Sequence, residues 1–402
     1  MTIIVVGTLA NDPYAGMAWM HMQMVVGFLR LGHNAYYFEI TSAWPQNPEL
    51  EMRVDNVEYA VPYLNRVAES FGIGDRWAYR STFASPAEWY GMSKLKAEDL
   101  LANADIVFNV SSATRSIKEE MKVGRLVYYG TDPVYHEIMF HQKDEYTISL
   151  VNEHDDVVTY GENIGNADCP IPALPNLRAK TRQPVLMDHW SNNVIPNNNF
   201  TTIGNWKQGG RDLSFNGEVY YWSKHHEFLK FMDVPLRTDQ SIELAMNLTK
   251  PENIHHGEGT VVPALGIAEE EYMLLISNGW KMTSGPALSR DPMTYRDYII
   301  HSRGEFTFAK DQNIRLRSGW FSERSACYLA AGRPVITQDT GFSSILPTGE
   351  GLFAFTTIED IIYAFEEINS NYKKHSQAAL DIAQSYFKAE TVLAKLLHDL
   401  GG

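Results

Sequence analysis

The chain opens with a strand–helix–strand pattern, which constrains the fold more than any other feature of the sequence. Residues 2–7, TIIVVG, form a continuous β-branched run that ends in glycine, as is typical of a buried parallel strand. A helical pattern follows over residues 17–31 and ends at Gly32, and residues 34–40, NAYYFEI, form the expected next strand. Two parallel strands joined by a helix make a βαβ unit, so we expect a parallel sheet covered by helices.

Buried strands that end in polar loops recur further along the chain. Residues 104–110 and 125–133 have this pattern, which predicts a doubly wound first domain. Residues 169–199 are rich in Pro and Asn and have weak periodicity, as a domain connection does. A strand followed by glycine begins again within residues 200–208, and the sequence therefore predicts a second domain of the same kind.

The length of the chain also requires more than one hydrophobic core. Its 402 residues suffice for two domains of about 200 residues each. We predict an α/β protein with two Rossmann-like, doubly wound domains facing a cleft. The predicted domains are residues 1–190 and 191–380, followed by a C-terminal helix over residues 381–402 that packs back on the first domain.

Composition narrows the classes of function. The formal net charge of −15 gives no general affinity for phosphate backbones or anionic lipid surfaces, so we expect no general binding of nucleic acid. Cys169 and Cys327 are the only cysteines, which argues against a disulfide framework or a structural zinc site and favours a reducing compartment. The sequence has no signal-peptide pattern and no apolar run of about 18 residues or more. We expect a cytoplasmic protein without a transmembrane segment, and a homodimer is left open.

The segment LRSGWFSERSACYLAAGRPVI, residues 316–336, carries the strongest functional signal. Ser318 and Gly319 precede Ser322, a good helix N-cap, and Gly332 ends the short helix before an apolar strand. The amino end of a helix offers unpaired N–H groups and the positive end of the helix dipole, and a glycine ahead of it lets an anion approach closely. The pattern suits a phosphate, and it equally suits a capped helix that binds nothing.

The longer segment SGWFSERSACYLAAGRPVITQDTGF, residues 318–342, resembles the donor-binding region of nucleotide-sugar glycosyltransferases of the GT-B fold, with a C-terminal domain of the glycosyl transferase family 1 type. The resemblance is specific over residues 295–356 and extends as architecture over the whole chain. It includes TYGENIG (159–165), TIGNW (202–206) and SRGEF (302–306), which resemble the strand ends that face the cleft in that fold. It implies a metal-independent transferase that moves a sugar from a UDP-, GDP- or dTDP-sugar to an acceptor hydroxyl, with no cofactor beyond this co-substrate.

The resemblance also implies a donor site in the second domain. Ser318, Gly319 and Ser322 would supply N–H and hydroxyl donors to the diphosphate, and Lys224 and Arg303 would supply positive charge. Either cation can equally be a surface or ion-pair residue. The complete expected donor site, whose last two members follow a strand where that fold contacts the donor sugar, is Gly204, Asn205, Lys224, Ser302, Arg303, Ser318, Gly319, Trp320, Ser322, Glu323, Asp339 and Gly341.

The sequence departs from the family pattern at two places. Many retaining members carry two glutamates around this helix, where the present chain has Gly319 and Cys327. Glu323 is the only acid on the helix, where it could bond the donor ribose or the sugar hydroxyls. The histidine of the inverting plant-type members falls near Met17, and His21 lies one turn further on. The stereochemical outcome therefore stays open.

Inverting transfer needs a base that takes the acceptor proton, and we expect it in the first half of the chain. Asp132, in GTDP at a strand end, is the best placed, followed by His21, His154 and Glu162. A histidine on an amphipathic helix is more often structural, and Asp132 before Pro133 can equally be a turn residue. The sequence contains no D-x-D motif, and adjacent histidines on a helix point apart, so no metal site is expected.

These observations predict an enzyme of the glycosyltransferase class with a small-molecule, glycan or modified-nucleobase acceptor. Two alternatives remain. A nucleotide-sugar epimerase of the same fold would need no separate acceptor, and a catalytically silent module would bind a nucleotide or glycan without turnover. The sequence fixes neither the sugar nor the nucleotide base.

Overall fold

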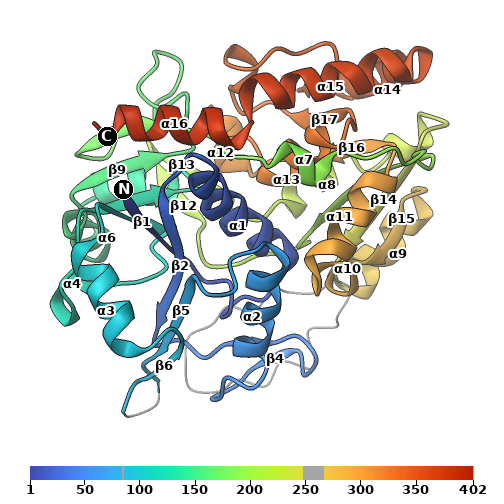
Figure 1. The fold of residues 1–402 in the computed structure, drawn as a ribbon. Helices are drawn as coiled ribbons and strands as arrows, with labels where there is room; N and C mark the ends of the chain where they lie inside the picture. Colours follow the sequence, from blue (N-terminus) through green and yellow to red (C-terminus); the bar gives the residue numbers. More distant parts are fainter. Residues whose placement is uncertain (84–85, 248–266, 402) are drawn as a thin grey trace. The chain divides into compact units, whose positions relative to one another are not determined.

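The computed structural model describes residues 1–83, 86–247 and 267–401, which form two compact units (Figure 1). The N-terminal unit comprises Met1–Tyr160, Pro172–Leu186 and Ala389–Gly402, and the C-terminal unit comprises Gly161–Ile171 and Met187–Lys388. The main passage between the units thus falls after Leu186, where the sequence suggests residue 190. Two features differ from the expected division: residues 161–171 belong to the C-terminal unit, and the returning segment begins at Ala389.

The N-terminal unit is built on an eight-stranded sheet. Across the sheet its strands are β10 (Leu177–Lys180), β9 (Asp156–Thr159), β8 (Leu126–Gly130), β7 (Ile106–Val110), β1 (Thr2–Val6), β2 (Asn34–Thr41), β5 (Trp77–Ser81) and β6 (Glu88–Gly91). Every pairing is parallel except that of β6 with β5. The chain winds outward from β1 in both directions, so the strand order reverses between β1 and β7. In such sheets ligands bind at the carboxyl ends of the strands beside this switch point.

Helices cover both faces of this sheet. They are α1 (Ala15–Arg30), α2 (Ala60–Ser70), α3 (Lys94–Asn103), α4 (Ile117–Glu120), α5 (Tyr135–His141), α6 (Glu145–Glu153) and α16 (Ala389–Asp399). The central strands β7 and β8 are buried at every position, as their apolar sequences predict. The returning helix α16 packs directly on α1, because a Cβ at Gly27 would lie 2.5 Å from the side chain of Leu393.

The C-terminal unit has a six-stranded, fully parallel sheet. Its strands in spatial order are β15 (Lys281–Ser284), β14 (Ser241–Met246), β11 (Asn199–Gly204), β16 (Gly304–Thr307), β17 (Val335–Gln338) and β18 (Leu352–Phe355). Here the order reverses between β11 and β16. Both units are therefore doubly wound α/β structures, and the predicted fold class is confirmed.

The described helices of the C-terminal unit are α7 (Met187–Trp190), α8 (His225–Lys230), α9 (Glu269–Ser277), α10 (Gly285–Ser289), α11 (Pro292–His301), α12 (Asp311–Arg315), α13 (Glu323–Ala330), α14 (Ile358–Ser370) and α15 (Tyr372–Tyr386). Buried side chains of α8, α9 and α14 join an aromatic core that includes Phe200, Phe228, Phe306 and Phe308. A short hairpin, β12 (Leu213–Phe215) and β13 (Glu218–Tyr220), follows β11 before α8 begins.

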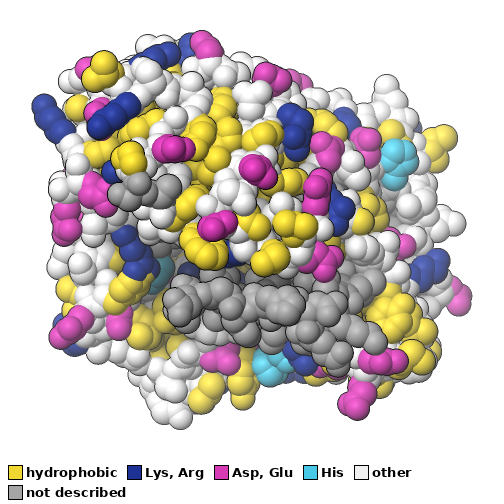
Figure 2. All heavy atoms as spheres, turned by 90° about the horizontal axis from the view of Figure 1, so that it is seen from below, with side chains coloured by type: hydrophobic (Ala, Val, Ile, Leu, Met, Phe, Trp, Pro, Cys, Tyr) yellow, Lys and Arg dark blue, Asp and Glu magenta, His cyan; other side chains and the backbone are white. Residues whose placement is uncertain are grey.

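The described residues include no helix that is long and apolar enough to cross a bilayer. Within the same residues, no group of three or more His, Cys, Asp or Glu side chains is placed to hold a metal ion. On the face drawn in Figure 2, acidic and basic side chains are interspersed among apolar ones.

Candidate functional site

The predicted helix of the 316–336 segment is present as α13. Ser322 is its N-cap, in an extended conformation, and its hydroxyl makes no capping hydrogen bond to the first turn. Gly332 follows the helix with a φ of +68°, a left-handed conformation that suits glycine. The first N–H groups of a helix have no acceptor within the helix itself, so the amino end of α13 offers the donors and the positive dipole end that the sequence predicts for it.

The turn ahead of α13 is held by the protein itself. The Ser318 hydroxyl donates to Asn313 Oδ1 at 2.7 Å, and the Gly319 N–H donates to the Thr340 carbonyl at 2.8 Å. Gly319 has a φ of +77°, and a Cβ at this position would lie 2.5 Å from the backbone nitrogen of Asn163. The Ser318 hydroxyl and the Gly319 N–H are therefore used within the protein, and Gly319 packs against Asn163, so we do not place these two residues in the diphosphate site.

The loop after β17 is likewise organised by internal bonds. Asp339 Oδ1 accepts from the Gly341 N–H at 2.9 Å, and its Oδ2 accepts from the Ser343 hydroxyl at 2.8 Å. Gly341 adopts a φ of +93°. Both carboxylate oxygens of Asp339 thus hold the turn in place. Any contact of this loop with a sugar would therefore come from other groups of the turn.

Two expected donor residues lie at the opposite end of their strand. The segment SRGEF was expected at the carboxyl end of a strand, but β16 begins only at Gly304, so Ser302 and Arg303 precede it. The Ser302 hydroxyl donates to the Tyr298 carbonyl at 2.8 Å, and Arg303 Nε donates to Asn369 Oδ1 at 2.9 Å. The placement of this segment was wrong, and we leave Ser302 and Arg303 out of the site.

The segment TIGNW is at the carboxyl end of its strand, as expected. Gly204 is the last residue of β11, and Asn205 follows it. Lys224, at the N-cap of α8, lies with its Nζ 5.4 Å from the centre of the Trp320 ring. The structure therefore brings Lys224 together with Trp320, two residues ahead of the α13 N-cap. Glu323 lies in the first turn of α13, and its Oε1 accepts from Cys327 Sγ at 3.4 Å.

Arg324, which is not among the donor residues expected from the sequence, occupies the switch point of this unit. Its Nη1 donates to the carbonyl of Ile203 on β11, and its Nη2 donates to Thr307 Oγ1 on β16 at 2.9 Å. Its Nε donates to Glu305 Oε1 at 2.5 Å, and the Glu305 side chain is fully buried. A charged residue inside the apolar run GEFTF was the available signal for this pair, but only the strand order brings it to Arg324.

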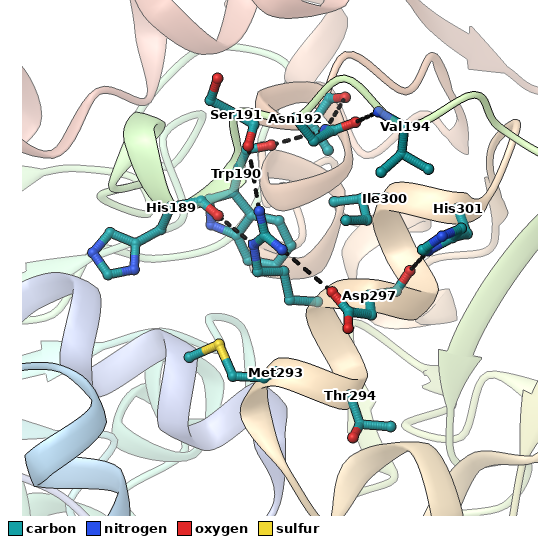
Figure 3. A network of polar contacts seen from close by, with 12 residues as sticks. His189, Trp190, Ser191, Asn192, Val194, Met293, Thr294, Asp297, Ile300 and His301 are labelled. Carbon is teal, nitrogen blue, oxygen red and sulfur yellow. Dashed lines mark hydrogen bonds and ion pairs between the residues drawn. The ribbon is translucent and has the colours of Figure 1, made fainter.

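Two other arginines fix the start of the main segment of the C-terminal unit. Arg296 donates to the carbonyls of His189 and Ser191, and the labelled residues of Figure 3 show this segment lying against α11. Arg333, from the GRP motif, donates from Nε to the Ile300 carbonyl at 3.0 Å and from Nη2 to the Val194 carbonyl at 2.9 Å. The side chain of Arg333 therefore has a structural role, because it holds backbone segments of this unit together.

In the N-terminal unit, Asp132 lies in a strained turn after β8. Val134 has a φ of +97°, which is unusual for a β-branched residue, and its N–H donates to Glu137 Oε2 at 2.8 Å. Ser111 and Ser112, after the neighbouring strand β7, also have positive φ, and Ser111 Oγ lies 2.5 Å from Thr131 Oγ1. Strained backbone of this kind gathers at functional sites, and this signal supports Asp132 over the other expected bases.

The other expected bases are placed differently. His21 is 1% exposed, and its Nδ1 donates to the Met17 carbonyl at 2.8 Å. Burial lowers the pKa of His21 to about 4, so the ring is neutral at physiological pH. His154 is buried, with Nε2 3.0 Å from Asn109 Nδ2, and burial lowers its pKa as well. Glu162 lies in the C-terminal unit and not in the first, where it was expected.

Comparison with known proteins places the fold. No family model and no curated protein matches the chain. HepE from Anabaena, solved with UDP, matches with 12% identity and a TM-score of 0.59 over 100% of both chains. An alpha-glucosyltransferase solved with UDP matches with 10% identity and a TM-score of 0.58 over 100% of this chain and 99% of its own. Sucrose-phosphate synthase from Thermosynechococcus elongatus matches with 9% identity and a TM-score of 0.56 over the same shares.

These similarities extend over the full length of the chain. They confirm the resemblance stated for residues 295–356 at the level of the fold: the chain has the GT-B fold.

Proposed function

We propose that this protein is a glycosyltransferase that moves a sugar from a nucleotide diphosphate sugar to an acceptor hydroxyl. The observation that carries the proposal is the full-length similarity in fold to HepE and to an alpha-glucosyltransferase, both solved with UDP. UDP is therefore the nucleotide we expect, and UDP-glucose is the donor to test first. The acceptor is a small molecule, a glycan or a modified nucleobase.

The donor is proposed to bind at the carboxyl ends of β11 and β16 in the C-terminal unit. The amino end of α13 and Lys224, beside Trp320, would stabilise the negative charge of the leaving diphosphate. Gly204, Asn205, Ser322 and Glu323 lie along these ends and would line the site. The proposal includes no metal ion, because the helix and the lysine supply positive potential.

For an inverting transfer, the base is proposed to be Asp132, which would take the proton of the acceptor hydroxyl as it attacks the sugar. Its support is its position beyond β8 and the strained turn that it shares with Val134. His21 is less suited because its buried ring takes up a proton only near pH 4, which makes it a weak base, and because its Nδ1 is bonded to the Met17 carbonyl.

A thermal-shift panel of UDP, GDP, dTDP and ADP tests the donor half of the proposal. A nucleotide present at 100 times its Kd adds about 2.7 kcal/mol of stability, so UDP should raise the Tm by several degrees. Turnover of UDP-glucose is then followed with a panel of sugar and aglycone acceptors. An epimer formed without acceptor would favour the epimerase, and binding without any turnover would favour the silent module. The proposal fails if none of the four nucleotides raises the Tm at millimolar concentration.

A further inference from the structure

The guanidinium of Arg324 bridges the two strands that flank the switch point of the C-terminal unit. Nη1 bonds to the last carbonyl but one of β11, that of Ile203, and Nη2 bonds to the Thr307 hydroxyl at the end of β16. Arg324 itself is in the first turn of α13. The positive charge therefore lies where the carboxyl ends of both strands meet the amino end of the helix, which is the position at which open α/β sheets bind their ligands.

The buried Glu305 side chain fixes this guanidinium through its Nε. Its Oε1 accepts from Nε at 2.5 Å, and its buried Oε2 has no hydrogen-bond partner among the residues that the structure describes. Burial would lower the pKa of Arg324, but the Glu305 carboxylate outweighs it and the pKa is raised, so the arginine keeps its charge. A buried ion pair is seldom the most stable solution for a core, because desolvation offsets much of the attraction. Its presence at this place suggests a task beyond stability.

The side chain still has hydrogen-bond donors to offer. A guanidinium carries five N–H groups, and the three bonds above, which are those to described residues, leave one N–H on each terminal nitrogen. Space adjoins it at Gly204, where a Cβ would lie 3.8 Å from Nη1 and would meet no other heavy atom of the described residues within 4 Å. Two parallel N–H groups of an arginine match the oxygens of a phosphate.

We infer that Arg324 contacts the diphosphate of the donor and that Glu305 is the residue that positions it. This inference rests on the proposed function and adds to it a cation that comes from the helix itself. Arg324 would receive the charge that develops on the leaving nucleoside diphosphate, while Glu305 keeps the guanidinium from swinging away when the site is empty. A purely architectural ion pair would instead affect folding and leave ligand discrimination unchanged.

The test compares the affinities of UDP and uridine, measured by calorimetry, for the wild type and for Arg324→Gln. Loss of a charged hydrogen bond should lower the affinity for UDP about 10- to 100-fold. The affinity for uridine, which has no phosphate, should change less than about twofold. Arg237→Gln is the matched control, because Arg237 is an exposed arginine of the same unit that pairs with Asp233, and both affinities should stay at the wild-type values. Glu305→Gln should also lower the affinity for UDP, but by a smaller factor than Arg324→Gln.

The outcomes are distinguishable. If the wild type binds UDP and Arg324→Gln binds it equally well, the inference fails and the proposed function stands. If the wild type binds neither UDP nor uridine, the proposed function fails and the inference fails with it. Should the Gln variant not fold, Arg324→Lys provides the readout: it keeps the charge but not the paired N–H groups, so a selective loss for UDP of about 10-fold supports the inference and an unchanged affinity overturns it.

Discussion

Glu39 uses both of its carboxylate oxygens to hold the loop that follows β1. Oε2 accepts from the Ala10 N–H and Oε1 from the Asn11 N–H, each at 2.7 Å, and the Tyr37 hydroxyl donates to Oε2 at 3.1 Å. The Leu9 N–H in turn donates to the Tyr37 hydroxyl at 2.8 Å. Two side chains of β2 thus fix three successive amides at the carboxyl end of β1, beside the switch point of the N-terminal unit.

The pKa of the Glu39 carboxyl group predicts how the stability of the protein depends on pH. Burial raises the pKa of Glu39 to about 8 against the bonds from Ala10 and Asn11, which lower it. The folded state therefore binds the proton more tightly than the unfolded state, where the pKa is 4.5. This contribution to stability is complete below pH 4.5 and is lost as the pH rises through 8. From pH 6 to pH 9 the free energy of unfolding should fall by about 3 kcal/mol from Glu39 alone.

Urea unfolding of the wild type and of Glu39→Gln at both pH values isolates this effect. The Gln variant has no titrating group here, so the difference in unfolding free energy between the two proteins should shift by that amount with pH. Equal pH dependence of the two proteins would show that Glu39 does not keep its proton in the folded state.

At the scale of elements, the loop that leads into α13 is shaped by a segment from far away in the sequence. Asn163 donates from its backbone to the Ser318 carbonyl at 3.1 Å and from Nδ2 to the Arg317 carbonyl at 2.8 Å. Asp168 accepts from Arg317 Nε at 2.8 Å. Residues 161–171 thus support the turn from one side, and Gly319 is small because Asn163 lies against it.

The substitution Gly319→Ala should therefore be more destabilising than its backbone conformation alone implies. Gly217, in the turn between β12 and β13, has a similar φ of +82° but no heavy atom of the described residues within 4 Å of a Cβ. Gly217→Ala should lose about 1 kcal/mol, from the left-handed backbone, and Gly319→Ala about 3 kcal/mol, because Asn163 must also move. Chemical denaturation of both variants measures this, and equal losses would contradict the packing role assigned to Asn163.

Local signals made part of this site predictable. The bounds of α13 followed from Ser322 and Gly332, because a cap and a left-handed glycine act within a few residues. The strand end at Gly204 followed from an apolar run that stops at glycine. The pairing of Arg324 with Glu305 could not be predicted, because it depends on β11 and β16 being neighbours. SRGEF was assigned to the wrong end of its strand, since its apolar run does not mark where pairing begins.

At the scale of the whole molecule, the chain builds two sheets of the same kind, each with its own switch point. In the C-terminal unit this point, between β11 and β16, carries Arg324. In the N-terminal unit it lies between β1 and β7, and Asp132 follows β8, the next strand. Length and βαβ periodicity predicted these two sheets, whereas the short segment 161–171 that joins the C-terminal unit has no periodic signal. The proposal thus assigns nucleotide binding to one unit and proton transfer to the other.

Because nucleotide binding and proton transfer are assigned to different units, we expect two single variants to behave in opposite ways. Asp132→Asn removes the base but no proposed nucleotide contact, so release of UDP from UDP-glucose with a productive acceptor should slow about 100-fold or more while the Kd for UDP stays unchanged. Arg324→Gln should instead lower the affinity for UDP. Asp75→Asn, at an exposed aspartate of the same unit as Asp132, should alter neither quantity. A wild-type rate in Asp132→Asn would remove Asp132 from the mechanism, and a weakened affinity for UDP would show that the N-terminal unit also contributes to the nucleotide site.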